Sequence, residues 1–325
     1  MIQFKSNLVC LTFSVLSCLI TLQPAQAESL INDWNYTSDS DADSIRRLPN
    51  GNYTVGGTIY EIYGTGIKED ADHIWVGINT NLPSEGFTGP FYGDFSGNVG
   101  HGDLFFDFSG LGSFKAASDS ASLFAVRFAE ENDSGASEIG VYNSVKAKSV
   151  VVENNGWSNL YNHNLGGVEP LTDNSNSATM GNLDWDNSYY DPYTKQGDLT
   201  IPETLIPNVI DSGNKIGDIT LLDEDELISA GFDSSNFLAS GNKLFGFKFD
   251  KSLLPSGDFI ASLILECNND ATAMAGLFLP PPPPQPDPKP VPEPGTNTAI
   301  IAMSLFGFGW QLKRRKKADK ASVIS

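Results

Sequence analysis

Short apolar runs recur along the middle of the chain, separated by clusters of Gly, Asn, Asp and Ser. Runs of this length that are rich in Val, Ile, Thr, Tyr and Phe are typical of β-strands. In one of them Lys248 alternates with Phe247 and Phe249, as in a strand with one exposed face. The predicted strands occupy residues 53–63, 74–78, 104–108, 123–128, 139–142, 145–152, 244–249 and 259–265. The pattern therefore predicts an all-β domain, a β-sandwich or a jelly roll.

One short helix is expected within this domain, at residues 222–231. Asp223 is a suitable N-cap, Glu226 follows three positions later as in a capping box, and Gly231 suits the C-terminal end. A single helix of this size does not change the predicted fold class.

Residues 154–207 interrupt the strand pattern and predict a long insertion between two strands, rich in Asn, Ser, Asp and aromatic residues. Its aromatic residues are Trp157, Tyr161, Trp185, Tyr189, Tyr190 and Tyr193. Two interpretations stay open. The rings pack the insertion onto the sandwich, or Trp157, Trp185 and Tyr190 stack on sugar rings while Asn and Asp side chains bind the hydroxyl groups.

The first 27 residues have the organisation of a secretory signal peptide. Lys5 precedes an apolar run at residues 8–22, and Ala25-Gln26-Ala27 fits a signal-peptidase site. The run is shorter than the ~20 residues that span a bilayer. The alternatives are an uncleaved anchor helix and lipid attachment at Cys18.

The other end of the chain has a different composition. Residues 280–294 form a proline-rich stalk, and residues 295–312 carry no charged side chain. As a helix, this second stretch would be about 27 Å long, close to the ~30 Å apolar thickness of a membrane. Residues 313–325 form a basic tail that the positive-inside rule places in the cytoplasm. The preceding domain, residues 28–279, is therefore expected outside.

The order of these C-terminal parts resembles the PEP-CTERM sorting signal that exosortase reads in Gram-negative bacteria. Pro292-Glu293-Pro294 stands before the apolar stretch, and the basic stop consists of Lys313, Arg314, Arg315, Lys316 and Lys317. The resemblance implies transient anchoring in the inner membrane, cleavage near the motif, and transfer to the cell surface or extracellular matrix. An ordinary tail anchor behind a proline stalk is the alternative.

A second resemblance covers most of the middle of the chain. The segments YEIYG, GDLFFDF, IGVYNSVKAKSV and LECNND, which begin at Tyr60, Gly102, Ile139 and Leu265, are similar to those of cyanobacterial exosortase-dependent surface proteins. That family implies a location and supplies no reaction, cofactor or catalytic residue.

Charge and residue counts exclude several classes of function. The net charge of -20 argues against a nucleic-acid partner, because a polyanion repels phosphate. His73, His101 and His163 have no metal-ligand spacing, and the sequence has no Cys-x-x-Cys, no phosphate loop and no Gly-x-Ser-x-Gly elbow. Cys267 is the one cysteine outside the predicted signal peptide and is expected to be a buried thiol.

Calcium is the one candidate cofactor. Asp39, Asp41 and Asp43 alternate as at the start of a calcium loop, but Ser44 and Asn50 replace the Gly and Glu that an EF-hand loop requires. A solvated turn is the alternative. Weaker candidates are residues 184–187 and the strand end at residues 266–270, which hold further carboxylate and amide oxygens.

The sequence thus predicts an exported surface or matrix protein with a structural or adhesive, non-enzymatic role. Signal peptidase and exosortase are its expected processing enzymes. The C-terminal helix would hold it in the membrane before processing. A carbohydrate-binding module that contacts envelope or extracellular polysaccharide is the main alternative. A glycosidase on a jelly-roll scaffold is the second, and it would need two facing carboxylates in a cleft.

Overall fold

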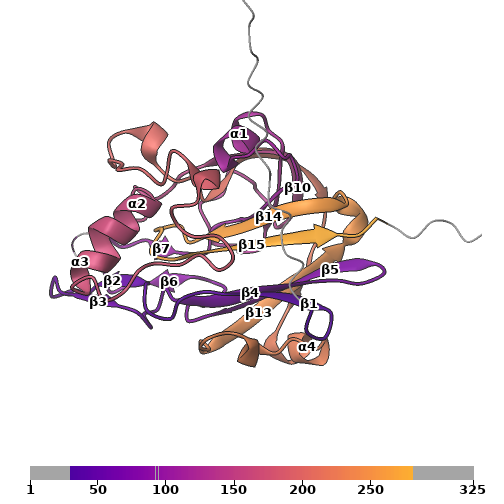
Figure 1. Cartoon of the computed structure of the whole chain (residues 1–325), viewed down its shortest axis with the longest axis horizontal. Coiled ribbons are helices and arrows are strands. Elements are labelled where there is room, and N and C mark those ends of the chain that lie inside the picture. The colour runs from indigo at the N-terminus through magenta and orange to yellow at the C-terminus, as the bar shows by residue number, and fades with distance from the viewer. Residues whose placement is uncertain (1–29, 92, 94, 281–325) are drawn as a thin grey trace, which may run out of the picture. The chain divides into compact units, whose positions relative to one another are not determined.

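Two antiparallel β-sheets lie face to face in the computed structural model, which describes residues 30–91, 93 and 95–280 (Figure 1). The five-stranded sheet has the order β1 (Trp34–Ser38), β4 (Ile62–Glu69), β5 (His73–Thr80), β13 (Lys243–Asp250), β12 (Thr220–Leu222). The six-stranded sheet has the order β11 (Val209–Gly217), β10 (Gly140–Lys148), β9 (Leu123–Arg127), β8 (Leu104–Asp107), β14 (Gly257–Ile264), β15 (Ala271–Phe278). Two short ribbons pair β2 (Ile45–Arg47) with β3 (Tyr53–Val55) and β6 (Phe87–Thr88) with β7 (Asn98–Val99).

Apolar side chains from both sheets form the core between them. Val76 and Phe247 of the five-stranded sheet belong to the same buried cluster as Phe106 and Leu263 of the six-stranded sheet. Each of these four side chains is 0% exposed. This arrangement confirms the predicted all-β sandwich, because burial between two sheets is what alternating apolar strands require.

The outer face of the five-stranded sheet is also covered. The helix α4 (Glu224–Ser229) and the residues after it bring Leu227, Phe232 and Phe237 over Trp34 and Tyr36 of β1. The sheet is therefore buried on both faces, which explains why β4 is buried along most of its length.

The predicted insertion covers the outer face of the six-stranded sheet. It lies between β10 and β11 and contains no strand. Near residue 181 the insertion runs alongside the edge strand β15, where Ala273 N–H donates to Met180 O at 2.8 Å and Asn182 N–H to Ala273 O at 3.0 Å. The insertion thus protects a strand edge that would otherwise be open to pairing with other chains.

The described residues contain more helices than the single short helix that was predicted. The expected helix is α4, and its capping box is present: Glu226 N–H donates to Asp223 Oδ1 at 2.9 Å and Asp223 N–H to Glu226 Oε2 at 3.0 Å. Further α-helices are α1 (Phe114–Asp119), α2 (Leu160–His163) and α3 (Glu169–Leu171), with a π-helical turn, η1 (Asn164–Val168), between the last two. Short 3-10 turns are η2 (Ser188–Tyr190), η3 (Pro202–Thr204), η4 (Ser234–Asn236) and η5 (Lys251–Leu253).

The strand predictions missed four strands of the two main sheets, divided another, and joined β3 to only the first two residues of β4 in the run 53–63. Two predicted runs, 139–142 and 145–152, correspond to one strand, β10, with an irregular register between Tyr142 and Val145. The missed strands are β1, β11, β12 and β15, and β15 is rich in Ala and Gly, which have low strand propensity. Lys248 does alternate with buried Phe247 and Phe249 as expected, and its ammonium lies 4.4 Å from the Trp75 ring centroid.

The predicted signal peptide, apolar helix, basic tail and all but the first residue of the stalk lie outside the described residues. Within residues 30–91, 93 and 95–280, no helix has the length and apolar character needed to cross a bilayer.

Two glycines that pair across β4 and β5, Gly66 and Gly77, form a short glycine row that makes room for Phe232 on the outer face of the five-stranded sheet. A Cβ atom on Gly77 would overlap the Phe232 ring. We predict that Gly77→Ala destabilises the chain by about 1–3 kcal/mol through overpacking. In a double-mutant cycle, measured by urea unfolding, Phe232→Leu should recover part of this loss.

Gly166→Ala is the matched control, because the nearest atom to its added Cβ would be 3.8 Å away on Trp157. This control should leave the free energy of unfolding unchanged or raise it by up to about 1 kcal/mol, because Ala favours a helical backbone over Gly. An unchanged stability of Gly77→Ala would contradict the packing role of the glycine row.

Candidate functional site

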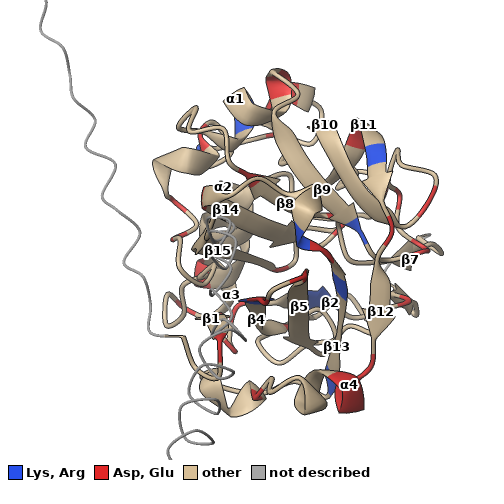
Figure 2. Cartoon of the chain, turned by 90° about the vertical axis from the view of Figure 1, so that its right-hand side faces the viewer, with Lys and Arg blue, Asp and Glu red and all other residues tan. Residues whose placement is uncertain are grey.

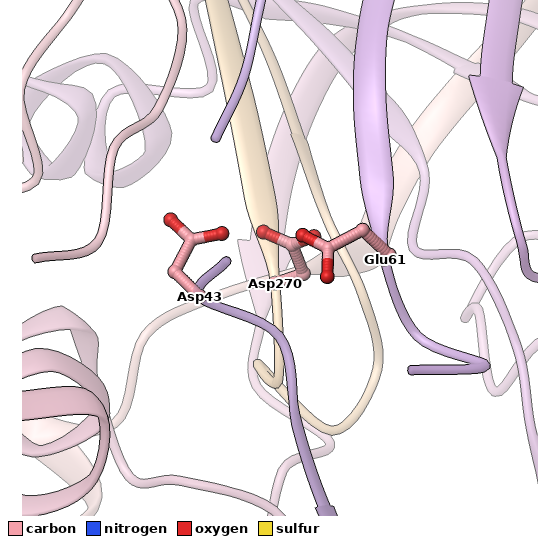
Figure 3. A group of neighbouring side chains, drawn as sticks. All are labelled: Asp43, Glu61 and Asp270. Carbon is pink, nitrogen blue, oxygen red and sulfur yellow. The ribbon is translucent and has the colours of Figure 1, made fainter. Parts of the chain in front are cut away.

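Three buried carboxylates converge where the start of β4 meets the start of β15 (Figure 3). Asp43 lies in the loop before β2, Glu61 directly precedes β4, and Asp270 directly precedes β15. One carboxylate oxygen of each lies within 4.8 Å of the corresponding oxygens of the others. Asp43 and Glu61 are 0% exposed and Asp270 is 1% exposed. We call these three residues, together with neighbouring Asp39, the acidic cluster.

Asp39 is also 0% exposed and is held by the insertion. The Thr179 hydroxyl donates to Asp39 Oδ1 at 2.8 Å, and Thr179 N–H donates to Asp43 Oδ2 at 2.7 Å. Ser40 N–H donates to Asp39 Oδ1 at 2.9 Å. One residue of the insertion therefore fixes the orientation of two carboxylates from the N-terminal segment.

Glu61 is oriented through a single oxygen. The Ser44 hydroxyl donates to Glu61 Oε2 at 2.6 Å, and Gly57 N–H donates to the same oxygen. These contacts close the segment between β2 and β4 around the carboxylate.

Asp270 joins the two sheets. Ile62 N–H, at the start of β4, donates to Asp270 Oδ2 at 2.6 Å, and Ala271 N–H donates to Asp270 Oδ1 at 2.8 Å. The sequence separation between Ile62 and Asp270 is 208 residues, so this bond is a tertiary link of the sandwich.

The environment favours the neutral form of these acids. Burial, with added repulsion from neighbouring carboxylates, raises the pKa of Asp39, Asp43 and Asp270 well above the ordinary value. Burial also raises the pKa of Glu61, against the hydrogen bonds from Ser44 and Gly57. Ion pairs among the described residues, such as Lys251 with Glu69 and Lys215 with Glu138, use other carboxylates.

The structure brings only two of the three predicted calcium residues together. Asp39 and Asp43 enter the acidic cluster, whereas Asp41 is exposed, because the chain bends at residues 41–42 and directs that side chain to solvent. Among the weaker candidates, Asp270 is part of the cluster, and Asp184 and Asp186 are exposed. Glu61 was missed, since its sequence neighbours Tyr60 and Ile62 indicate only a strand.

Glu266, also in a weaker candidate group, belongs to a separate network. Gly100 N–H donates to Glu266 Oε2 at 2.7 Å, and Asp133 N–H donates to Oε1. Burial, opposed by these two hydrogen bonds, raises the pKa of Glu266 to about 7. Both oxygens are thus paired with donors, unlike those of Asp39, Asp43 and Glu61, each of which has one unpaired oxygen.

The structure also has a pocket of about 310 Å³. Some of the residues that line it are close in sequence to residues of the acidic cluster. Its aromatic lining is Tyr53, Tyr60, Phe91, Phe95 and Trp157, and its amide lining is Asn154, Asn155, Asn162 and Asn269. Arg47 and Ser158 add further polar groups. None of the described residues that line this pocket is an Asp, Glu or His.

The predicted aromatic binding residues do not form one exposed plane. Tyr190 is 0% exposed, and its hydroxyl lies 2.8 Å from that of Ser262 on β14. Trp185 is partly buried against the apolar cluster of the insertion, and Trp157 lines the pocket. The expectation of a sugar platform that includes Tyr190 is therefore wrong in its geometry, because a buried ring cannot stack on a ligand.

Cys267 is 1% exposed, which agrees with the expected buried thiol. Burial raises its pKa to about 12.

Acidic side chains occur throughout the described part of the chain, with a group at the first turn of α4 (Figure 2).

The comparisons with known proteins concern the C-terminal end. The PEP-CTERM protein-sorting motif matches residues 290–315. This match confirms the sorting signal around Pro292, Glu293 and Pro294 and indicates a protein that is exported, processed by exosortase and sorted to the cell surface. No curated protein and no solved structure shows significant similarity to the chain.

The raised pKa of Glu266 predicts a pH dependence of stability. Between the ordinary value near 4.5 and about 7, the folded chain binds this proton more tightly than the unfolded chain. The contribution of Glu266 to stability is therefore greatest below pH 4.5 and is lost as the pH rises through about 7. We predict that the free energy of unfolding of the wild type, relative to that of Glu266→Gln, decreases between pH 5 and pH 8. The reason is that the Glu266 carboxyl ionises in this range, whereas the Gln amide does not.

Urea unfolding in chelator at several pH values measures this difference. The acidic cluster acts in the same direction in both proteins, so the comparison isolates Glu266. A pH-independent difference between the two proteins would contradict the prediction.

Proposed function

We propose that the mature chain is a non-enzymatic structural or adhesive protein of the cell surface or extracellular matrix. The PEP-CTERM motif carries this proposal, because it directs the domain to the outside of the cell. The domain itself supports it: both sheets are covered on their outer faces, which favours a stable body over a mobile enzyme-like cleft.

The positions of titratable groups also support a non-enzymatic role. His101 and His163 are 0% and 5% exposed, and burial lowers the pKa of each to about 4. A glycosidase needs two carboxylates that flank a substrate in an accessible cleft. The carboxylates of the acidic cluster are buried instead, and the described lining of the pocket around Trp157 offers no such pair.

The sorting proposal predicts the result of changing the motif. Replacement of Pro292, Glu293 and Pro294 together by Ala should leave the uncleaved chain in the inner membrane, because exosortase no longer recognises it. Fractionation followed by intact-mass measurement tests this outcome. A matched triple Ala replacement within the stalk, at Pro281, Pro282 and Pro283, should be processed normally. Unchanged surface release of the motif variant would refute the proposal.

Carbohydrate binding is the second candidate function, and the pocket around Trp157 is the observation that favours it. The pocket combines aromatic faces with amide groups, as sugar sites do, and its volume falls within the ~300–1,000 Å³ range of ligand pockets. Trp157 contributes to both this pocket and a small apolar cluster with Ile45 and Val168. Envelope or extracellular polysaccharide is the ligand class that an exported protein would meet.

Two pocket variants test this second candidate. Trp157→Ala and Asn155→Ala should each reduce polysaccharide retention by at least about fivefold if the pocket binds sugar. Asn155 is exposed but has a φ of 49°, where Ala is less favourable than Asn, so its replacement should cost about 1 kcal/mol of stability and leave the chain folded. Affinity electrophoresis and thermal melting measure the two effects.

Trp185→Ala is the control, since Trp185 is partly buried in the same insertion and does not line the pocket. Equal retention of all three variants and the wild type would exclude the pocket as the sugar site.

A further inference from the structure

Three oxygens of the acidic cluster lack the partners that buried polar atoms normally have. Asp39 Oδ2, Asp43 Oδ1 and Glu61 Oε1 are buried and accept no hydrogen bond. In each residue the other oxygen receives the donors, so the side chain is fixed while one oxygen stays unpaired. Most buried side-chain polar atoms have a partner, and an unpaired one costs about 1–3 kcal/mol or more when charged. Two of these residues, Asp43 and Glu61, also belong to the group of converging carboxylates, and unpaired oxygens there indicate a ligand that takes lone pairs.

We propose that Asp43, Glu61 and Asp270, with Asp39 beside them, bind a calcium ion that holds the sandwich together. Calcium takes oxygen ligands at about 2.3–2.6 Å, so oxygens on opposite sides of one ion are about 4.6–5.2 Å apart. The converging oxygens of the three residues lie within 4.8 Å of one another and fit around one such ion (Figure 3). The inference goes beyond the proposed surface function and does not depend on it.

The chemistry of the cluster favours calcium over other divalent cations. Its three converging side chains offer only carboxylate oxygens, whereas zinc sites use Cys and His. Magnesium requires ligands at about 2.0–2.1 Å and usually keeps several waters. Exposures of 0–1% for these side chains leave little access for a hydrated ion.

The site would connect parts of the chain that are far apart in sequence. Asp39 and Asp43 belong to the N-terminal segment, Glu61 and Asp270 precede strands of different sheets, and Thr179 orients two of the carboxylates from the insertion. A ligand that binds only the folded arrangement stabilises it by RT ln(1 + [L]/Kd). Calcium would therefore stabilise the whole domain and not one loop.

The competing occupant of the cluster is a proton. The carboxyl groups of Asp43 and Glu61 are placed to form a hydrogen bond with each other when one is protonated. A shared proton would satisfy Asp43 and Glu61 without any metal, and the experiment must distinguish the two occupants.

The test uses the surface-processed chain, treated with chelator and then titrated with calcium chloride in a calorimeter at constant ionic strength. We expect saturable binding of one ion per chain. We also expect the melting temperature to rise by about 5 °C or more at calcium concentrations 100-fold above the dissociation constant. Magnesium chloride at the same ionic strength should give a much smaller rise.

Asp43→Asn and Asp41→Asn are a matched pair, since both remove one negative charge from the same loop, one inside the cluster and one exposed to solvent. Asp43→Asn should weaken calcium binding at least tenfold and lose the calcium-dependent rise in melting temperature. In chelator it should melt at or above the wild type, because one buried charge has been removed. Asp41→Asn should behave as the wild type in both conditions. If Asp43→Asn does not fold, Glu61→Gln serves as the cluster variant.

Several results would overturn the proposal. The absence of binding and of a calcium-dependent rise up to about 10 mM, ten times the ~1 mM of weak extracellular sites, would leave the proton as the occupant. An equal rise with magnesium would contradict the calcium assignment. Equal loss of binding in Asp41→Asn and Asp43→Asn would show that any bound ion lies elsewhere.

Discussion

Burial of several carboxylates at one point is the constraint on which this domain depends. A charged group loses its hydration when buried, and neighbouring like charges add repulsion, so the folded state must supply compensation. Backbone N–H groups and hydroxyls supply part of it, and they come from the loop after β1, the start of β4, the start of β15 and the insertion. The same contacts that partly satisfy the acids therefore align both sheets. We therefore expect the occupancy of this cluster, by a cation or by protons, to affect the stability of the whole sandwich.

The pocket around Trp157 shares chain segments with this junction. Ile45, Tyr60 and Asn269 line the pocket and stand within two positions of Asp43, Glu61 and Asp270 in the sequence. The pocket and the acidic cluster are therefore built on the same three chain segments. A sugar-binding role of the pocket and ion binding by the cluster are thus separate hypotheses with a common structural basis.

Local sequence pattern predicted what local interactions determine. The caps of α4 follow from Asp223 and Glu226 alone, and the alternation of Lys248 with its neighbours identifies a strand with two different faces. Strand β15 could not be recognised in this way, because its Ala and Gly residues owe their extended conformation to pairing with β14. The acidic cluster was found only in part for the same reason. Asp39, Asp43 and Asp270 stand in polar segments that attract notice, whereas Glu61 lies between apolar residues and gains its role through tertiary contacts.

The C-terminal sorting motif and the acidic cluster are connected, because the motif determines the solvent in which the domain is placed. Extracellular calcium modules bind with dissociation constants of about 10⁻⁴–10⁻³ M, far weaker than intracellular sensors at about 10⁻⁷–10⁻⁵ M. A site of the extracellular class would gain its ion only after export, where the ion concentration is sufficient. Before export, repulsion within the cluster would keep the domain less stable. The sorting motif at residues 290–315 then determines where the domain functions and also the solvent in which its buried charges are balanced.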